Sequence, residues 1–539
     1  MRTIVLSVAL LAASGLASAR AATADPTPGD LVLRCHFTGL DALLADTNAA
    51  KLKQIWALPA TGALRQQACD QLARVPFQVL SNFVAKGAAD QAALFRPLLD
   101  DVFPSESYLE WRGPTRLPTE FAFAIRLTDE RAKLWRENLQ QALKAWKFGA
   151  ITSDGDGWVF QRFDGRTSFA VSRVGQWTVL GLGPAGMKLH SDMLKTIKAS
   201  GRPVEKSPYW LEADANLAQL KEWLPPLAAY EAPPMAHLCL SNSADYVRTV
   251  MRLDFGQKHG WTPEPWAVPT NVIRDPLISF TVAQGIAPLL KPLKFFQQLN
   301  LDPQPNQLIT WAQPQFPFMS YFAVPLQSAG PQLVRITPLL SSLVLSNGPQ
   351  SLPGKIDWST NQQSVVWQGL PIAMPQLAAV KSPQHEYIIG GLFPRASGTN
   401  PPPPGLFAQL GRTNLVYYDW EFTGQIPGAP VESRLKQWQT LYQLSDILHG
   451  WTLSRTNLPT QQWLQEVSPL LGNTLTEITA TSPTEMTLVR NSQSGFTGFE
   501  LVSFTRWLDS PEFPRFSVAG HPKLARPVKT RPAPKSSKP

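Results

Sequence analysis

The feature that most constrains the fold is that the chain repeats itself. Residues 31–44 read as a strand that runs through Gly39 into a helix, and residues 277–290 read the same way through Gly285. In both segments β-type residues come first and leucines at helical spacing follow. At one constant offset, Leu31, Gly39, Leu43 and Leu44 recur as Leu277, Gly285, Leu289 and Leu290.

A second pair of segments matches more closely. Residues 110–127 and 310–326 each predict a strand, a proline turn and a second strand, which is a hairpin. The residues that correspond are Trp111, Pro114, Pro118, Phe123, Ala124 and Leu127 with Trp311, Pro314, Pro317, Phe322, Ala323 and Leu326. In both segments a helix, three strands, a strand with its helix and a closing antiparallel pair follow in the same order.

This order predicts an α+β protein made of two tandem divergent copies, each a mainly antiparallel sheet covered by helices. Copy one spans 31–256 and carries an extra helical segment at 48–100. Copy two spans 277–510. The Pro- and Trp-rich segment 257–276 between them reads as a linker.

The first residues predict export. Arg2 gives a positive start, residues 3–17 are uncharged and apolar or small, and small-x-small sites follow. We expect a signal peptide at 1–21 and a place in the periplasm or outside the cell. An uncleaved membrane anchor is the alternative, although the apolar run is shorter than the ~20 residues that a span needs. No later window predicts a transmembrane segment.

The charge distribution argues against a nucleic-acid partner. The formal net charge is +9, but Arg2 and Arg20 lie in the predicted signal peptide and six further basic residues lie in the acid-free tail 521–539. The folded body therefore carries only about +1. A nucleic-acid-binding protein should instead show a basic face on its fold. The tail is rich in Pro, Lys, Arg and Ser, which predicts disorder.

The cysteines permit one disulfide. The chain has Cys35, Cys69 and Cys239, and an exported protein can oxidise a pair. Cys35 on a predicted strand and Cys69 on a predicted helix are the candidate pair. Buried free thiols are an equally good interpretation. Without a C-x-x-C motif, the sequence predicts no metal centre of that type.

Two carboxylates on one strand are the only candidates for catalysis. Tyr417, Asp419 and Glu421 share one face of a predicted strand, and the aromatic residues between them share the other. Paired carboxylates beside an aromatic ring are typical of glycan-cleaving sites. The alternative places Tyr418, Trp420 and Phe422 in the core and the two acids in water, because charged residues are normally exposed.

Other motifs indicate no cofactor. The sequence from Gly181 to Gly186 has the G-x-G-x-x-G spacing, but Pro184 removes a backbone N–H that phosphate binding would use. The linker residues Trp261 and Trp266 are candidates for ligand binding together with Tyr417. The alternative is that both tryptophans pack into the seam between the copies.

The arrangement resembles large exported bacterial proteins of unknown function that repeat a strand–helix unit. This resemblance implies an envelope location. We expect a non-enzymatic protein that binds a ligand or partner, in the cleft between the copies. A glycan- or peptide-active hydrolase using Asp419 and Glu421 is one alternative, and a structural envelope component is another. A large apolar pocket lined by few charges would favour binding, and two facing carboxylates in a groove rimmed by Trp would favour hydrolysis. If neither feature is present, the structural role is favoured.

Overall fold

The structure is a computed structural model. It describes residues 31–513 except 49, 81–90, 114–118, 148, 166, 222–231, 292–293, 302, 316–318, 347–354, 370–372, 394–399, 426–432, 449–457 and 511–512. The predicted signal peptide 1–21 and the predicted tail 521–539 lie outside the described residues.

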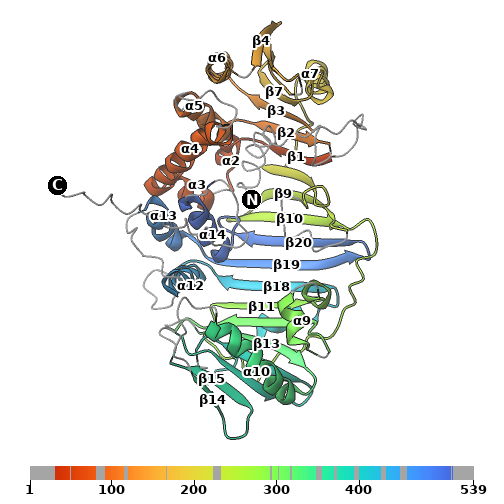
Figure 1. Cartoon of the computed structure of the whole chain (residues 1–539), viewed down its shortest axis with the longest axis vertical. Coiled ribbons are helices and arrows are strands. Elements are labelled where there is room, and N and C mark those ends of the chain that lie inside the picture. Colours follow the sequence, from red (N-terminus) through yellow and green to blue (C-terminus); the bar gives the residue numbers. More distant parts are fainter. Residues whose placement is uncertain are drawn as a thin grey trace, which may run out of the picture.

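Twenty strands form one sheet, and every strand pair in the described part of the chain is antiparallel. Figure 1 shows the strands stacked from β4 to β14 along the long axis. The first ten strands are β1 (Leu31–Phe37), β2 (Ser107–Arg112), β3 (Glu120–Arg126), β4 (Gly149–Asp154), β5 (Gly157–Arg162), β6 (Ser168–Val174), β7 (Trp177–Gly183), β8 (Leu211–Asn216), β9 (Met235–Ser243) and β10 (Tyr246–Asp254). The other ten are β11 (Ser279–Gln284), β12 (Gln307–Ala312), β13 (Ser320–Leu326), β14 (Lys355–Trp358), β15 (Ser364–Gln368), β16 (Gln376–Lys381), β17 (Glu386–Gly391), β18 (Leu415–Phe422), β19 (Asn473–Ser482) and β20 (Glu485–Ser492).

The two halves of the sheet have the same strand order. Hydrogen-bonded neighbours in the first half run β4-β5-β6-β7-β3-β2-β1-β8-β9-β10. Those in the second run β14-β15-β16-β17-β13-β12-β11-β18-β19-β20. Gly39 and Gly285 each follow the first strand of their half with a positive φ, of 89° and 75°, before a short helix.

The predicted fold class, two units each with its own helix-covered sheet, is wrong. β10 pairs with β20 from Val247–Ser492 to Asp254–Glu485, so one sheet runs through both halves. Each half alone would end in a strand with a row of unpaired backbone N–H and C=O groups. Pairing these two edges satisfies both rows and makes the seam part of one continuous sheet.

Helices of both halves meet in one shared apolar cluster, while other helices cover only the strands of their own half. In the first half they are α2 (Leu40–Ala45), α3 (Ala50–Ala57), α4 (Pro59–Leu80), α5 (Ala92–Val102), α6 (Asp129–Trp146) and α7 (Lys188–Ser200). In the second half they are α8 (Ala287–Leu290), α9 (Lys294–Leu299), α10 (Ala329–Ser346), α11 (Pro404–Ala408), α12 (Arg434–Leu448), α13 (Pro459–Val467) and α14 (Gly498–Asp509). None of these described helices is long and apolar enough to cross a membrane.

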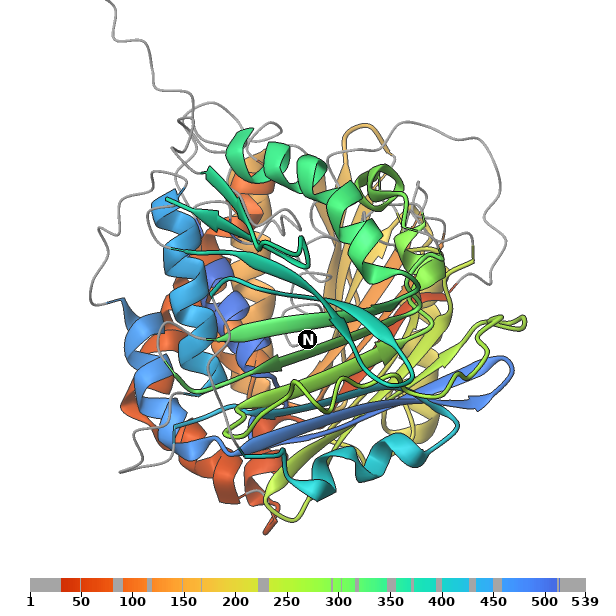
Figure 2. The ribbon, with the colours of Figure 1, turned by 90° about the horizontal axis from the view of Figure 1, so that it is seen from below.

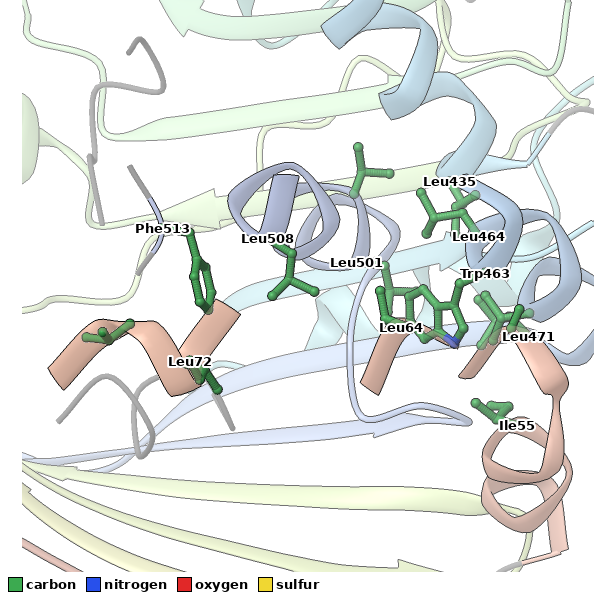
Figure 3. Close-up of a cluster of buried hydrophobic side chains, with 14 residues drawn as sticks. Ile55, Leu64, Leu72, Leu435, Trp463, Leu464, Leu471, Leu501, Leu508 and Phe513 are labelled. Atoms are coloured by element: carbon green, nitrogen blue, oxygen red, sulfur yellow. The ribbon is translucent and has the colours of Figure 1, made fainter. Parts of the chain in front are cut away.

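One apolar cluster joins the halves through their helices. Ile55, Leu64 and Leu72 on α3 and α4 pack with Trp463 on α13 and Leu501 on α14. In Figure 3, Ile55, Leu64 and Trp463 lie together at one end of the cluster, and Leu72 lies toward the other end near Phe513. Figure 2 shows the red helices of the first half and the blue helices of the second along the same side of the sheet. The extra helical segment predicted at 48–100 therefore connects the first half to the second.

Strand β3 shows how the alternating pattern is used. Ala122 and Ala124 pack under α7, while Phe123 and Ile125 on the other face pack against Trp135 of α6. Sequence alternation predicts one wet face, but in this strand both faces are covered. Helix α6 begins where the Thr128 hydroxyl accepts a hydrogen bond from the Arg131 N–H, and it ends at Lys147 in the left-handed conformation.

Candidate functional site

The two predicted acids lie inside the protein. Asp419 and Glu421 are only 8% and 3% exposed, so the interpretation that placed them in water is wrong. They point to the sheet face that α12 and α14 cover. Tyr418, on the opposite face, is buried in an apolar cluster, and Trp420 packs against that cluster. The acids are buried because α12 and α14 close over them, which the strand sequence alone does not encode.

A row of polar side chains crosses four strands at this point, and we call it the buried polar ladder. Cross-strand pairing aligns its members, which are Ser279 and Thr281 on β11, Asp419 and Glu421 on β18, Thr474 and Thr476 on β19, and Arg490 and Ser492 on β20. All except Thr281 and Arg490 are buried. The corresponding face of most sheets in a protein core is apolar, so each of these groups needs a partner.

One oxygen of each carboxylate accepts hydrogen bonds. The Thr281 hydroxyl donates to Asp419 Oδ1 at 2.6 Å. Glu421 Oε1 accepts from the Thr423 hydroxyl at 2.8 Å and from the Gly498 backbone N–H at 2.6 Å. Gly498 is the first residue of α14, where the helix dipole favours a negative charge.

A second set of contacts ties α14 to the ladder. Thr497 and Glu500 form a capping box at the start of α14. Glu500 Oε2 also accepts from Arg490 Nη1 at 2.7 Å, and Arg490 Nε donates to the Thr476 hydroxyl at 2.9 Å. Strands β19 and β20 thereby hold the helix whose N-terminus contacts Glu421.

Burial dominates the electrostatics of the pair. Burial, and then the charge of Asp419, raise the pKa of Glu421 to about 7, while the Gly498 N–H, the Thr423 hydroxyl and the Arg434 charge oppose this. Burial likewise raises the pKa of Asp419, against the hydrogen bond from Thr281. Burial lowers the pKa of Arg434, although the charges of Glu421 and Asp419 act to raise it.

The other predicted site residues pack as structural elements. Tyr417 shares the face of the two acids, and burial raises the pKa of its hydroxyl. Trp261 is partly buried against Gly285, and Trp266 packs against the apolar cluster of the second half. The predicted linker at 257–276 therefore lies on the second half, and neither tryptophan is an exposed ligand platform.

The candidate disulfide is not formed. Cys35, Cys69 and Cys239 are all buried free thiols. Cys35 belongs to the apolar cluster on one face of the first half, whereas Cys239 lies on the opposite face of the sheet beside His237. Burial raises the pKa of the Cys35 thiol to about 12.

Sequence reasoning missed a group of side chains that could hold a metal ion. Within the described residues, Glu212, His237 and Cys239 are the His, Cys, Asp or Glu side chains that come close enough together for this. The sequence signal was a Glu-x-Asp strand and a His-x-Cys strand, whose two-residue spacing puts each pair on one face. The register that brings the two strands together could not be read from the sequence.

No family model matches the chain, and neither the curated proteins nor the solved structures gave a significant match.

Proposed function

We propose that this chain is an exported envelope protein that works without catalysis, as a rigid platform for a protein partner. The observation that carries the proposal is that both candidate catalytic acids are sealed beneath α12 and α14 and occupied by hydrogen bonds. A glycosidase needs its two carboxyl groups on either side of a bound sugar bond. A substrate cannot reach Asp419 or Glu421 unless α14 moves away.

The seam between the halves also disfavours a small ligand. The hypothesis of a ligand in a cleft between two copies required a gap, and the β10–β20 pairing fills it with eight cross-strand residue pairs. A binding partner would therefore have to contact the surface of the sheet. The sheet face opposite the buried polar ladder is half-exposed across the seam, and we call it the open face; it consists of Arg248, Val250, Arg252, Thr487, Val489 and Asn491.

Export supports the envelope location. The predicted signal peptide, the near-neutral body and the resemblance to large exported bacterial proteins all agree with a protein that works outside the cytoplasm. A mixed polar and apolar patch that spans both halves suits contact with another protein, since protein interfaces are of this mixed kind.

One experiment separates a platform from a hydrolase. The mature protein is incubated with host envelope glycan and envelope protein, and released fragments are measured by mass spectrometry. In parallel, a photo-cross-linking residue is placed at Arg252 on the open face, or at Glu137 on α6 as the control, in intact host cells. We expect no fragments and a discrete adduct only from position 252.

The variants Glu421→Gln and Glu137→Gln show whether any released fragments depend on the buried carboxylates. Glu137 has a 57% exposed side chain and lies on α6, a helix of the first half that is far from the ladder in sequence. Fragments that wild type and Glu137→Gln release, and that Glu421→Gln does not, would show that the sealed carboxylates act on a substrate. The platform proposal would then be wrong. Equal cross-linking at both positions would remove the open face as the binding surface.

A further inference from the structure

Two neighbouring strands of the first half carry a compact set of metal-binding side chains. β8 and β9 pair so that Glu212 lies opposite Cys239 and Asp214 lies opposite His237. All four side chains therefore project from the same face of the sheet. His237 Nε2 lies 3.3 Å from Cys239 Sγ and 3.8 Å from Glu212 Oε1. The ligand atoms of Glu212, His237 and Cys239 lie within 4.8 Å of one another.

Asp214 fixes the orientation of the histidine. Its Oδ1 lies 2.5 Å from His237 Nδ1, and its other oxygen accepts from Arg34 Nε at 2.9 Å. A hydrogen bond from Nδ1–H to a carboxylate leaves the lone pair of Nε2 available, and a carboxylate behind the histidine is the usual second partner of metal-bound histidine. The free nitrogen is the one that faces Cys239 and Glu212.

The distances agree with tetrahedral coordination. With Zn–S of about 2.3 Å and Zn–N or Zn–O of about 2.0 Å, tetrahedral angles place the N and S atoms about 3.5 Å apart and the N and O atoms about 3.3 Å apart. The observed 3.3 Å and 3.8 Å differ from these values by only a few tenths of an ångström. The third pair, a Glu212 oxygen and Cys239 Sγ, lies within 4.8 Å, and the flexible Glu212 side chain can move to shorten its distances to both partners.

The site is open on one side. The side chains of His237 and Glu212 are 27% and 36% exposed, while Cys239 is buried beneath them. Three protein ligands with a solvent-facing fourth position are the arrangement of zinc sites that hold a water or an external ligand. Thiolate and imidazole together select a borderline-soft ion over Mg²⁺ or Ca²⁺.

We propose that Glu212, His237 and Cys239 bind one Zn²⁺ ion, with Asp214 as the positioning residue of His237. On binding, the Cys239 thiol loses its proton to solvent and the thiolate, the His237 Nε2 lone pair and a Glu212 oxygen become ligands. Without a metal, the same atoms form a plain polar contact in which the thiol donates to His237 Nε2.

Metal titration of the full mature protein tests the site. The chain is stripped with a chelator under reducing conditions, titrated with Zn²⁺, and its bound metal is counted by elemental mass spectrometry. We expect one equivalent for wild type and for the control His385→Gln, whose histidine is exposed in a turn before β17. We expect Cys239→Ser and His237→Gln to lose that equivalent, and Asp214→Asn to bind 10- to 100-fold more weakly, about the loss typical of a second-shell partner.

Two further readouts keep the test decisive. Co²⁺ bound in place of Zn²⁺ should give a thiolate-to-cobalt charge-transfer band that Cys239→Ser lacks. If a variant does not fold, the wild type alone can still test the site. Zn²⁺ should slow the alkylation of Cys239 and leave the alkylation rates of Cys35 and Cys69 unchanged. No bound equivalent in wild type, or an equivalent that Cys239→Ser retains, would overturn the proposal.

Discussion

Stability should fall as pH rises through the range in which Glu421 ionises. The carboxyl group is buried, next to Asp419, and its pKa is raised to about 7 from the ordinary value of 4.5. In the unfolded chain the same group loses its proton near pH 4.5. Between these two values the folded state holds a proton that the unfolded state has released, so raising the pH favours unfolding.

The size of the effect follows from the two pKa values. One pKa unit corresponds to about 1.4 kcal/mol, so the difference gives about 3 kcal/mol in the free energy of unfolding. This stabilisation is fully present below pH 4.5 and is lost as pH approaches 7 and beyond. Asp419 shifts in the same direction, because burial raises its pKa too. Glutamine has the same shape as protonated glutamate, so Glu421→Gln should match wild type near pH 5 and exceed it at pH 8.

Urea unfolding followed by tryptophan fluorescence at pH 5, 6, 7 and 8 measures this. The comparison uses wild type, Glu421→Gln and Glu137→Gln, whose carboxyl group is solvent-exposed. We expect the urea concentration at the unfolding midpoint to fall equally for wild type and the exposed control as pH rises. The midpoint of Glu421→Gln should change less with pH. Parallel profiles for all three proteins would refute the reasoning, as would a wild-type stability that rises with pH.

Three further substitutions test the packing. Trp463→Ala, in the cluster that joins the halves, should cost about 3–5 kcal/mol in urea unfolding, and a loss below 1 kcal/mol would argue against that junction. Both Gly260 and Gly285 have a positive φ, so an alanine at either position should cost ~1–2 kcal/mol in a melting assay. Gly285→Ala should cost more than Gly260→Ala, because only at 285 would the added Cβ meet the Trp261 ring, at 2.3 Å. Equal costs would contradict that contact. Thr497→Ala removes the capping hydroxyl of α14 and should cost about 0.5–2 kcal/mol by urea unfolding, whereas Thr497→Ser should restore most of it.

The local elements could be predicted from the sequence because their signals are local. The prolines between residues 110 and 127, and between 310 and 326, separate strands that do pair as β2–β3 and β12–β13. Each closing antiparallel pair also forms, as β9–β10 and β19–β20. Alternation over five to eight residues and a turn residue at the right place are sufficient to specify a hairpin.

The joining of the halves could not be predicted in the same way. An edge strand such as β10 has the same alternation whether its outer side meets water, another molecule or β20. The pairing of Val250 with Val489 joins residues that are far apart in sequence, and no local pattern encodes it. The helical segment predicted at 48–100 is confirmed, but its packing against the second half could not be predicted, since amphipathic spacing indicates that a face is buried and not which half covers it.

The buried acids show the limit of residue-type rules. The rule that charged side chains lie in water failed at Asp419 and Glu421, because two of their hydrogen-bond donors, Thr281 and Gly498, come from distant segments. Gly498 is separated from Glu421 by 77 residues, yet its N–H donates to the carboxyl group together with the neighbouring Thr423 hydroxyl. A sequence scan finds the acids, but only the fold supplies their partners.

The same sheet position has opposite chemistry in the two halves. Counting from Gly39 and Gly285, Leu33 and Cys35 occupy the places of Ser279 and Thr281. In the first half these residues pair with Ala215 and Ala213 in an apolar cluster, whereas in the second they pair with Glu421 and Asp419. The difference requires a donor on the second half alone, and α14 provides it by starting directly over Glu421. Because burying an acid without such a donor would cost several kcal/mol, the buried polar ladder depends on the helix that covers it, although the two halves share one strand order.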